Sequence, residues 1–276
     1  MSGTLFIVGT PIGNLGDFSP RAVETLENCD FIAAEDTRVT LKLLNRFEIR
    51  KPMVSYFEHN RFERGPVIAD RILSGENCAL VTDAGMPAIS DPGEDLVKLC
   101  HEKGIKVESV PGPCAFTTAL ALSGMPSRRF TFEGFLPVDK SERKEHINSL
   151  VSESRTMIFY EAPHKLAQTL SDLAAALGDR EIAIVREITK IHEQVIRTTL
   201  CTAAKKYSEE PLKGEIVLII GGAPAEEKEK ISLEQAAEYA KDLVNGGESK
   251  SDAAKIAAKE FGYKKGEIYK LLITEE

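Results

Sequence analysis

The chain has 276 residues, a length that suits two packed α/β domains at roughly 100–200 residues each. Hydrophobic residues make up 42% and charged residues 28%, with 20 Gly and 13 Pro, which excludes a disordered, collagen-like or coiled-coil protein. The longest apolar runs, such as residues 216–220, are far shorter than the ~20 residues of a membrane-spanning helix. The N-terminus enters a strand-like run without a basic stretch or a cleavage site, so we expect a cytoplasmic protein.

The net charge is −8, from 35 Lys and Arg against 43 Asp and Glu. Proteins that hold nucleic acid through bulk electrostatics carry a basic excess, so a polyanionic partner would need a local basic patch here. The five cysteines are widely spaced, without a C-x-x-C motif, and we interpret them as small buried residues in a reducing compartment. Because H-E-x-x-H is also absent, we expect no metal site.

Short β-rich runs alternate with helical patterns over the first hundred residues. Ser19 is the expected N-cap of the first helix, with Pro20 at its first position. A later helix is expected to be capped by Asp91, with Pro92 at its first position and Glu94 closing a capping box. Continuous apolar strands between helices predict a largely parallel sheet with helices on both faces. The predicted strands are residues 5–8, 31–34, 54–56, 79–82 and 106–110.

The segment from Pro111 to Pro113 is the predicted linker to a second α/β domain. The pattern changes after it, because runs typical of strands follow one another beyond residue 178 without a helix between them. Such an order predicts a mixed sheet. The predicted elements are helices from about 115, over 141–152 and over 165–177, and strands over 129–133, 157–160, 182–185, 193–200 and 215–220.

Residues 223–276 differ in composition from the rest of the chain. A Glu/Lys run at 226–230 predicts a linker, and a small-residue face that ends at Gly262 suits a helix–turn–helix-like unit. Short helices are predicted around 233–244, 251–260 and 265–272. The expected domains are an N-terminal α/β domain over 1–111, a C-terminal α/β domain over 112–222 and the helical tail over 223–276.

A glycine loop, Gly9-x-x-x-Gly13-x-x-Gly16, follows the first predicted strand. Its spacing is not G-x-G-x-x-G, Pro11 stands where a dinucleotide fold needs free amides, and no acidic ribose partner follows at the right distance. A nicotinamide-binding Rossmann domain is therefore excluded, and so is a P-loop, because G-x-x-x-x-G-K-[ST] is absent. The loop stays open between a tight structural turn and a ligand-facing one.

Polar residues follow three predicted strands, at the sheet edge where open α/β sheets bind ligands. Glu35 and Asp36 follow the second strand, and the loop 83–85 follows the fourth with a flexible backbone that suits a close approach. We interpret Asp91 as a structural cap, while Asp36 stays open between a cap and a functional group. His59, after the third strand, stays open between a structural and a functional role.

Eight strings with unusual Pro and Gly content occur in order between residue 4 and about residue 222. They are LFIVGTPIGNLGD (5–17), AEDTR (34–38), TDAGMPAISDPG (82–93), SVPGPC (109–114), EGFLP (133–137), YEAP (160–163), VREITK (185–190) and GEIVLII (214–220). Together they resemble the tetrapyrrole-methylase superfamily, and within it the bacterial 16S rRNA (cytidine-2′-O)-methyltransferases. This resemblance implies two α/β domains with S-adenosylmethionine in the cleft between them, a small C-terminal helical segment, and a homodimer.

The resemblance also implies site residues, carried over position by position. The loop after the fourth strand would approach the methionine end of the cofactor. At Cys114 the wider superfamily commonly has Ser or Thr, and a thiol makes a weaker hydrogen bond. The implied cofactor-binding residues are Pro11, Asp83, Ala84, Gly85, Met86, Ile89, Cys114, Ala115, Tyr160, Ala183 and Gly214.

Methyl transfer to a ribose 2′-hydroxyl needs in-line positioning and a group that accepts the hydroxyl proton. The candidate acceptors are Glu35, Asp36, Glu58 and His59, and the sequence does not choose among them. The implied partner is 16S rRNA in the 30S subunit, with no membrane. The candidate substrate-binding residues are Asn14, Arg38, Asn60 and Arg61, with Arg64, Arg128, Arg129, Lys140, Arg143 and Lys144 as further local basic residues.

Two other functions remain open at this point. A methylase of a corrinoid or porphyrin precursor would keep the same superfamily and change the substrate. A non-enzymatic module could use the same cleft to sense S-adenosylmethionine or to bind the ribosome. The clustered carboxylates after the second and fourth strands argue against a pure binding module, and the C-terminal helices favour the RNA substrate.

Overall fold

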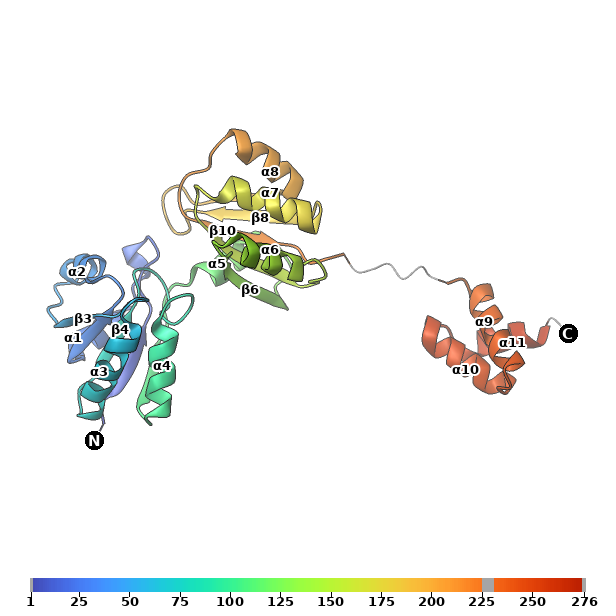
Figure 1. The fold of residues 1–276 in the computed structure, drawn as a ribbon, viewed down its shortest axis with the longest axis horizontal. Helices are drawn as coiled ribbons and strands as arrows, with labels where there is room; N and C mark the ends of the chain where they lie inside the picture. The colour runs from blue at the N-terminus through green and yellow to red at the C-terminus, as the bar shows by residue number, and fades with distance from the viewer. Residues whose placement is uncertain (1, 225–230, 275–276) are drawn as a thin grey trace. The chain divides into compact units, whose positions relative to one another are not determined.

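The computed structural model describes residues 2–224 and 231–274, so the predicted linker at 226–230 lies outside the described residues. The chain divides into two compact units, Met1–Ala223 and Pro224–Glu276 (Figure 1). Among the described residues, no helix is long and apolar enough to cross a bilayer. The predicted boundary between residues 111 and 112, inside the first unit, stays a prediction.

A five-stranded parallel sheet forms the first half of this unit, as the alternating pattern predicted. Its helices cover both faces, because buried side chains of α1 and α2 pack on one face and those of α3 and α4 on the other (Figure 1). The strand order is β3-β2-β4-β1-β5, with β1(Thr4–Val8), β2(Phe31–Ala34), β3(Met53–Ser55), β4(Cys78–Val81) and β5(Lys106–Val110). The helices are α1(Pro20–Asn28), α2(Thr37–Arg46), α3(Arg61–Leu73) and α4(Gly93–Glu102).

The starts of two of these helices test the expected caps. The Ser19 side chain accepts a hydrogen bond from the Ala22 amide at 3.1 Å, and Pro20 opens α1, as predicted. The prediction of a capping box at α4 is wrong, because the helix begins at Gly93 and its N-cap, Pro92, has no side chain that can accept a hydrogen bond. Asp91 lies one residue before this cap and uses its carboxylate to hold the loop in front of the helix.

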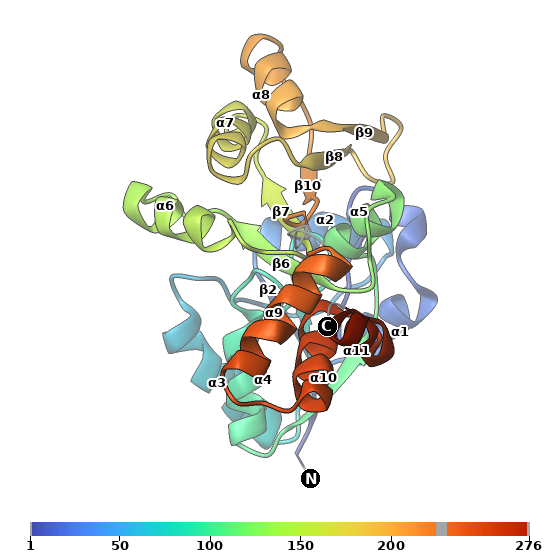
Figure 2. The same ribbon diagram turned by 90° about the vertical axis from the view of Figure 1, so that its right-hand side faces the viewer.

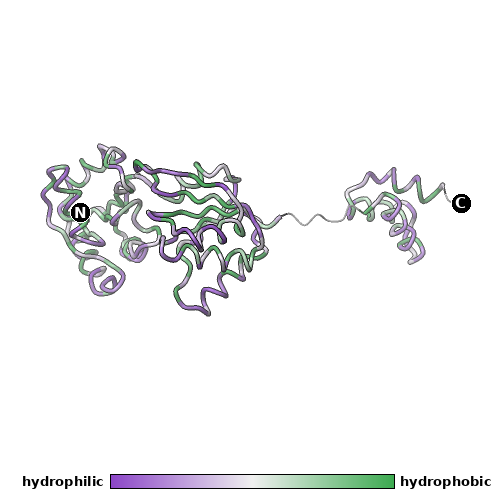
Figure 3. Tube along the Cα trace, turned by 90° about the horizontal axis from the view of Figure 1, so that it is seen from above, coloured by the Kyte–Doolittle hydropathy of each residue, from purple (hydrophilic) through white to green (hydrophobic). Residues whose placement is uncertain are grey.

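A second five-stranded sheet follows, in the order β6-β7-β10-β8-β9. The β6–β7 pair is parallel and the other pairs are antiparallel, so the predicted mixed sheet is confirmed. Figure 3 shows hydrophobic residues running along its buried strands. The strands are β6(Phe130–Phe135), β7(Thr156–Glu161), β8(Glu181–Arg186), β9(Gln194–Thr199) and β10(Ile216–Ile220), and the helices are α5(Ala115–Ser123), α6(Lys140–Ser149), α7(Leu166–Leu177) and α8(Leu200–Glu209).

Helix α8, between β9 and β10, was not expected. Its first residue, Leu200, ends the apolar run that predicted a strand, and its N-cap, Thr199, makes no side-chain capping bond. Helix α8 lies beside α7 (Figure 2), and Leu200, Ala203 and Tyr207 are buried in the core cluster that the two helices share. The prediction that all five cysteines are buried is also wrong in part: Cys201 is exposed on the first turn of α8 and Cys114 is half-buried, whereas the other three are buried.

The second unit contains α9(Leu233–Asn245), α10(Lys250–Phe261) and α11(Lys265–Thr274), close to the predicted helices. Alanines of α9 and α10, such as Ala236 and Ala254, are fully buried in its core. Ser232 and Gln235 form a capping box at the start of α9, and Gly262 ends α10 in the left-handed conformation. Small side chains let the helices approach closely, which suits the helix–turn–helix-like interpretation.

Two glycine backbones touch where the segment after β5 leaves the first sheet. A Cβ added at Gly9 would lie 2.6 Å from the Gly112 Cα and 2.7 Å from its nitrogen. The Gly9 amide donates to the Val110 carbonyl at 3.0 Å, and the Gly112 amide donates to the Met86 sulfur at 3.3 Å. No side chain fits between these backbones, so both positions require glycine.

We expect Gly9→Ala to lower the free energy of unfolding by about 1–3 kcal/mol, because the new methyl group forces backbone apart. Gly65→Ala is the matched control: it lies inside α3, and its Cβ would meet nothing closer than the Leu99 side chain at 3.5 Å. That change should be neutral or stabilising by about 0.5–1 kcal/mol. Urea unfolding of the two variants measures both values, and equal midpoints would contradict the close approach.

Candidate active site

A cavity of about 480 Å³ lies at the carboxyl end of the first sheet and is also lined by the second sheet; it is called the cleft below. The loop after β4 supplies one wall, and the beginning of α5 supplies another. The ends of β6 and β7 and the beginning of β10 complete it. The lining residues lie at 12, 35, 82–86, 89–91, 114–115, 135, 160–163, 188 and 215–217.

The wall after β4 is held by backbone hydrogen bonds to the glycine loop after β1. Thr10 and Gly85 exchange two hydrogen bonds, at 2.9 and 3.2 Å, and the Thr10 hydroxyl donates to the Thr82 carbonyl at 3.1 Å. Gly85 has a φ of 93°, which glycine adopts without strain. The Gly9–Gly16 loop therefore supports the wall of the cleft. It also contributes one lining residue, Ile12.

Asp91 fixes the next turn of this wall. Its carboxylate accepts from the amides of Ala88 at 3.0 Å, Ile89 at 3.3 Å and Gly93 at 2.8 Å. Ala88 and Ser90 have φ values of 67° and 64°, a conformation that costs energy for residues with a Cβ. Burial raises the pKa of Asp91 in spite of these hydrogen bonds. The residue interpreted as a helix cap thus anchors a strained loop whose neighbours line the cleft.

Carboxylates from two strand ends meet at the rim of the cleft. Glu35 Oε2 accepts from the Thr82 hydroxyl at 2.5 Å and from the Asp83 amide at 3.4 Å. The Asp36 amide donates to Asp83 Oδ1 at 3.1 Å. Desolvation, and then the negative charge of Glu35, raise the pKa of Asp83 above the ordinary value. A carboxylate with a raised pKa accepts a proton more readily than an ordinary one.

The other three candidate proton acceptors do not line the cleft. Asp36 caps α2 and pairs with Arg38 at 2.6 Å, and this hydrogen-bonded guanidinium lowers the pKa of Asp36 to about 2. Glu58 pairs with Arg61 at 2.9 Å. His59 lies edge-on to the Phe57 ring, at a centroid distance of 6.0 Å. A carboxylate with so low a pKa is a weak base, so Asp36 is poorly suited to the role.

The predicted substrate-binding residues also lie outside the cleft. Asn14 accepts from the Gly16 amide at 2.9 Å and caps a short 3₁₀ turn, η1(Leu15–Asp17). Asn60 is used within its own loop, accepting from the Phe57 amide. Arg61 bonds Glu58 as described, and its second partner is Asp95 at 3.0 Å. Arg38 is exposed beside Asp36.

Eight of the implied cofactor-binding residues line the cleft and three do not. Ala183 is fully buried in the core beneath α5. Gly214, with a φ of 98°, packs its backbone against Glu187. Pro11 lines a separate cavity of about 410 Å³ together with Lys42 and Arg46. The eight lining residues are Asp83, Ala84, Gly85, Met86, Ile89, Cys114, Ala115 and Tyr160.

Several lining residues were not singled out from the sequence. Glu161, Ile188 and Val217 stand inside the strings that carry the resemblance, next to residues that were chosen. Val217 reaches the cleft because β10 lies between β7 and β8 in the sheet, an order that the chain sequence does not reveal. Thr82 and Glu35 come from adjacent strand ends, and strand-end position is the signal that identified Glu35.

A model of the family described as Tetrapyrrole (Corrin/Porphyrin) Methylases matches residues 4–204. The chain belongs to this family, so the resemblance seen in the sequence is confirmed. It is 46% identical over 275 residues to a Synechocystis sp. protein named Ribosomal RNA small subunit methyltransferase I, covering 99% of each chain. A Thermotoga maritima protein of the same name is 46% identical over 220 residues, covering 99% of that protein and 80% of this chain.

The fold is also shared with solved structures. The uroporphyrin-III C-methyltransferase of Thermus thermophilus, complexed with S-adenyl homocysteine, has a TM-score of 0.56 and 15% sequence identity. The match covers 79% of this chain and 97% of that one. At so low an identity the likeness concerns the fold alone. The predicted α/β class with two sheets and a cleft is confirmed.

The two rim aspartates should respond to pH with opposite signs. The folded-state pKa of Asp83 is raised, so ionisation destabilises the fold as pH rises above 3.8, the ordinary value. Asp83→Asn should therefore raise the melting temperature at pH 7 relative to the wild type, with no difference below pH 3.8.

The matched variant is Asp36→Asn, which keeps the helix cap because Asn caps as well as Asp. The pKa of Asp36 is lowered from 3.8 to about 2, so its stabilisation is present at pH 7 and is lost as pH falls towards 2. This variant should melt at a lower temperature than the wild type at pH 7. Melting curves between pH 3 and 7 measure the change in melting temperature of each variant relative to the wild type. A change of the same sign in both variants at pH 7 would contradict the opposite pKa shifts of the two aspartates.

Proposed function

We propose that this protein transfers the methyl group of S-adenosylmethionine to the ribose 2′-hydroxyl of a cytidine in 16S rRNA. The observation that carries the proposal is the identity of 46% over 99% of both chains with a protein named for rRNA methylation. Methylation of a corrinoid or porphyrin precursor is less favoured, because solved structures of enzymes named for that chemistry are only 15–17% identical to this chain. The working form in this proposal is a homodimer acting on 30S subunits, which rests on the resemblance.

The cleft suits a small cationic cofactor. Its volume of about 480 Å³ is within the usual range for small-molecule sites. Of the residues that the structure describes, five carboxylates and no Lys or Arg line the cleft, and residues such as Ile12 and Val217 add apolar surface. S-adenosylmethionine carries positive charge on its sulfonium and ammonium groups, and it supplies an electrophilic methyl group when bound. The carboxylates would attract these cationic groups, and the apolar walls would hold the uncharged part.

The Glu35–Asp83 pair is positioned to accept the proton of the attacking hydroxyl. Glu35 is the one sequence candidate that lines the cleft, and Asp83 has a raised pKa. Asp83 also lines the cavity with Lys42 and Arg46, which lie one turn apart on α2. A phosphate held by these cations would bring its ribose close to Asp83, which lines both cavities.

The C-terminal unit has a supporting role in this proposal. The Thermotoga maritima relative is matched over nearly its whole length by 220 residues, close to the length of the first unit, Met1–Ala223. Methyl transfer is therefore assigned to the first unit. The Pro224–Glu276 unit, with lysines on α10 and α11, would add affinity for the ribosomal substrate.

Tritium transfer from labelled S-adenosylmethionine tests the substrate directly. Naked 16S rRNA, 30S subunits and a cobalt-corrinoid precursor are compared, using rRNA from a strain that lacks this gene. Label should appear in a cytidine 2′-O-methyl group, with 30S subunits as the better substrate. A chain ending at Ala223 should keep its S-adenosylmethionine affinity and lose more activity on 30S subunits. Label in the corrinoid and in neither RNA would overturn the proposed function.

Glu35→Gln should lower kcat on 30S subunits by roughly 10²–10⁴-fold, the usual contribution of a general base. Its S-adenosylmethionine affinity, measured by calorimetry, should stay within a few-fold of wild type, because the amide keeps the shape of the side chain. Glu58→Gln is the matched control, since Glu58 lies outside the cleft and pairs with Arg61. A Glu35→Gln enzyme with wild-type kcat would remove this residue from the proton-accepting pair.

A further inference from the structure

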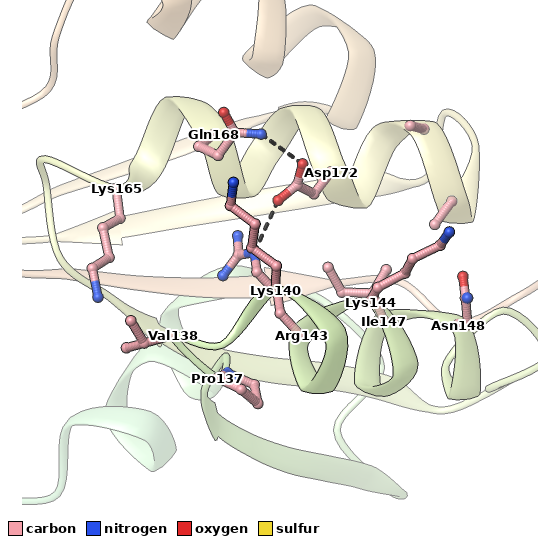
Figure 4. A pocket seen from close by; sticks show the side chains of 12 residues that line it. Pro137, Val138, Lys140, Arg143, Lys144, Ile147, Asn148, Lys165, Gln168 and Asp172 are labelled. Atoms are coloured by element: carbon pink, nitrogen blue, oxygen red, sulfur yellow. Dashed lines mark hydrogen bonds and ion pairs between the residues drawn. The ribbon is translucent and has the colours of Figure 1, made fainter.

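A larger cavity, of about 750 Å³, lies between α6 and α7 on the outer side of the second sheet; it is called the α6–α7 groove below. We propose that this groove binds the phosphodiester backbone of the substrate RNA beside the cleft, an inference that rests on the proposed function. Figure 4 shows the side chains of Lys140 and Lys144 extending from α6 towards α7, with Lys165 at the start of α7. These three ammonium groups line one continuous depression.

The groove is locally basic on an acidic chain. Its lining carries four cationic side chains, Lys140, Arg143, Lys144 and Lys165, against one carboxylate, Asp172. Arg143 is neutralised by Asp172 at 2.9 Å. The three lysines are exposed and have no carboxylate partner among the described residues. Three positive charges therefore face solvent in a protein whose net charge is −8, which is the local patch that a polyanionic ligand requires.

The charges of α6 are sorted between its faces. Residues 140, 143, 144, 147 and 148 line the groove, the spacing of one helix face. The acidic residues of the same helix, Glu142 and Glu145, are absent from the lining. The two arginines that the sequence grouped with this cluster, Arg128 and Arg129, do not line it either. A merely solvated helix needs no such separation of lysine from glutamate.

Two of the three lysines occupy positions that helix stability disfavours. Lys140 is the first residue of α6, and Lys165 is the N-cap of α7, where it makes no side-chain capping bond. The positive end of the helix dipole lies there, so acidic residues are preferred and cations are unfavourable. Their placement is explained by a ligand that carries negative charge into the groove.

Hydrogen bonds hold the base of the groove and connect it to the cleft. Arg143 donates from Nε to Asp172 at 2.9 Å and from Nη2 to the Thr169 hydroxyl at 2.7 Å. Gln168 donates to the other oxygen of Asp172 at 2.7 Å (Figure 4). The Thr169 hydroxyl in turn donates to Glu161, which is buried and lines the cleft. A chain of hydrogen bonds thus runs from the floor of the groove to the wall of the cleft.

Two short segments also join the groove to the cleft. Phe135 lines the cleft and Pro137 lines the groove, and the same holds for Pro163 and Lys165. Two residues of extended chain span at most about 7 Å. An RNA strand held in the groove is therefore close enough to place a neighbouring nucleotide at the mouth of the cleft.

The lining chemistry favours a sugar–phosphate backbone over other ligands. Within residues 2–224 and 231–274, no aromatic side chain lines the groove, so it offers no platform on which bases could stack. Its apolar lining residues include Pro137, Val138 and Ile147, without the Trp or Tyr anchors common in protein interfaces. Separated lysine ammonium groups hold phosphates as point charges and position the strand without reading its sequence.

The test replaces Lys140, Lys144 and Lys165 together by alanine. Binding to 30S subunits is measured between 50 and 200 mM salt, with KM and kcat for tritium transfer. Each phosphate contact with single-stranded nucleic acid contributes about 0.7 to the slope of log affinity against log salt, so the slope should become shallower by about 2. The ratio of the dissociation constant at 200 mM salt to that at 50 mM salt should then shrink by about 16-fold, because the salt concentration changes fourfold and the slope by about 2.

The same variant should show a raised KM for 30S subunits, with kcat and S-adenosylmethionine affinity close to wild type. A triple lysine-to-arginine variant keeps the charges and should keep the slope. The matched control removes three exposed lysines outside the groove, Lys98, Lys205 and Lys206, and should leave the slope unchanged.

One outcome would overturn RNA binding by the groove and leave the proposed function standing. In it, the wild-type enzyme methylates 30S subunits and the triple alanine variant has an unchanged salt slope and KM. An equal change in the control variant would also overturn it, because the effect would then be one of overall charge. If the wild-type enzyme transfers no methyl group to 30S subunits, both the proposed function and the role of the groove in it are overturned.

Discussion

The contact between the Gly9 and Gly112 backbones is the constraint on which the cleft depends. It joins the loop after β1 to the segment after β5, and the Gly112 amide holds the sulfur of Met86, a lining residue. One residue further along the first loop, Thr10 binds Gly85 through two backbone hydrogen bonds. Two more residues along, Ile12 is buried in the core of the second sheet. A single loop therefore ties the β4 wall to both sheets, and the absence of side chains at two glycines makes this possible.

Acidic and basic side chains of the first unit line different cavities. The cleft is lined by carboxylates, and the α6–α7 groove and the cavity beside Pro11 carry lysine and arginine. An acidic cleft attracts a cationic cofactor and disfavours a phosphate, while the basic cavities do the reverse. The two proposed ligands would thus be sorted by charge before any specific contact forms. A net charge of −8 says little about this arrangement, because the separation is local.

The sequence predicted what depends on local pattern. The apolar strands, the Ser19 cap and the Gly262 stop were placed correctly, since each follows from residues within one turn or strand. Features that depend on the tertiary order of the strands could not be predicted in this way, and the local capping box expected at α4 was also wrong. The family resemblance implied Ala183 as a cofactor-binding residue; it is buried in the core beneath α5, whereas Val217 of the neighbouring β10 lines the cleft. Helix α8 was not predicted because few of its residues are apolar and buried, and because no side-chain capping hydrogen bond marks its start. Strand ends identified Glu35, but only the fold shows that Asp36 and Glu58 are already paired with arginines.

The network from Arg143 to Glu161 gives the groove and the cleft a common physical basis. Glu161 is buried, with its carboxylate accepting from the Ala162 amide at 2.7 Å and from Thr169, so its charge is compensated by hydrogen bonds on both oxygens. Thr169 can donate to Glu161 because Arg143 donates to Thr169, which fixes the direction of the hydroxyl. Arg143 is itself held by Asp172 on the groove floor. A phosphate bound by the surrounding lysines would add negative charge near Arg143 and compete with Asp172 for it. Two hydrogen bonds, from Arg143 to Thr169 and from Thr169 to Glu161, join this arginine to the wall of the cleft, so the floor of the groove and the wall of the cleft belong to one network.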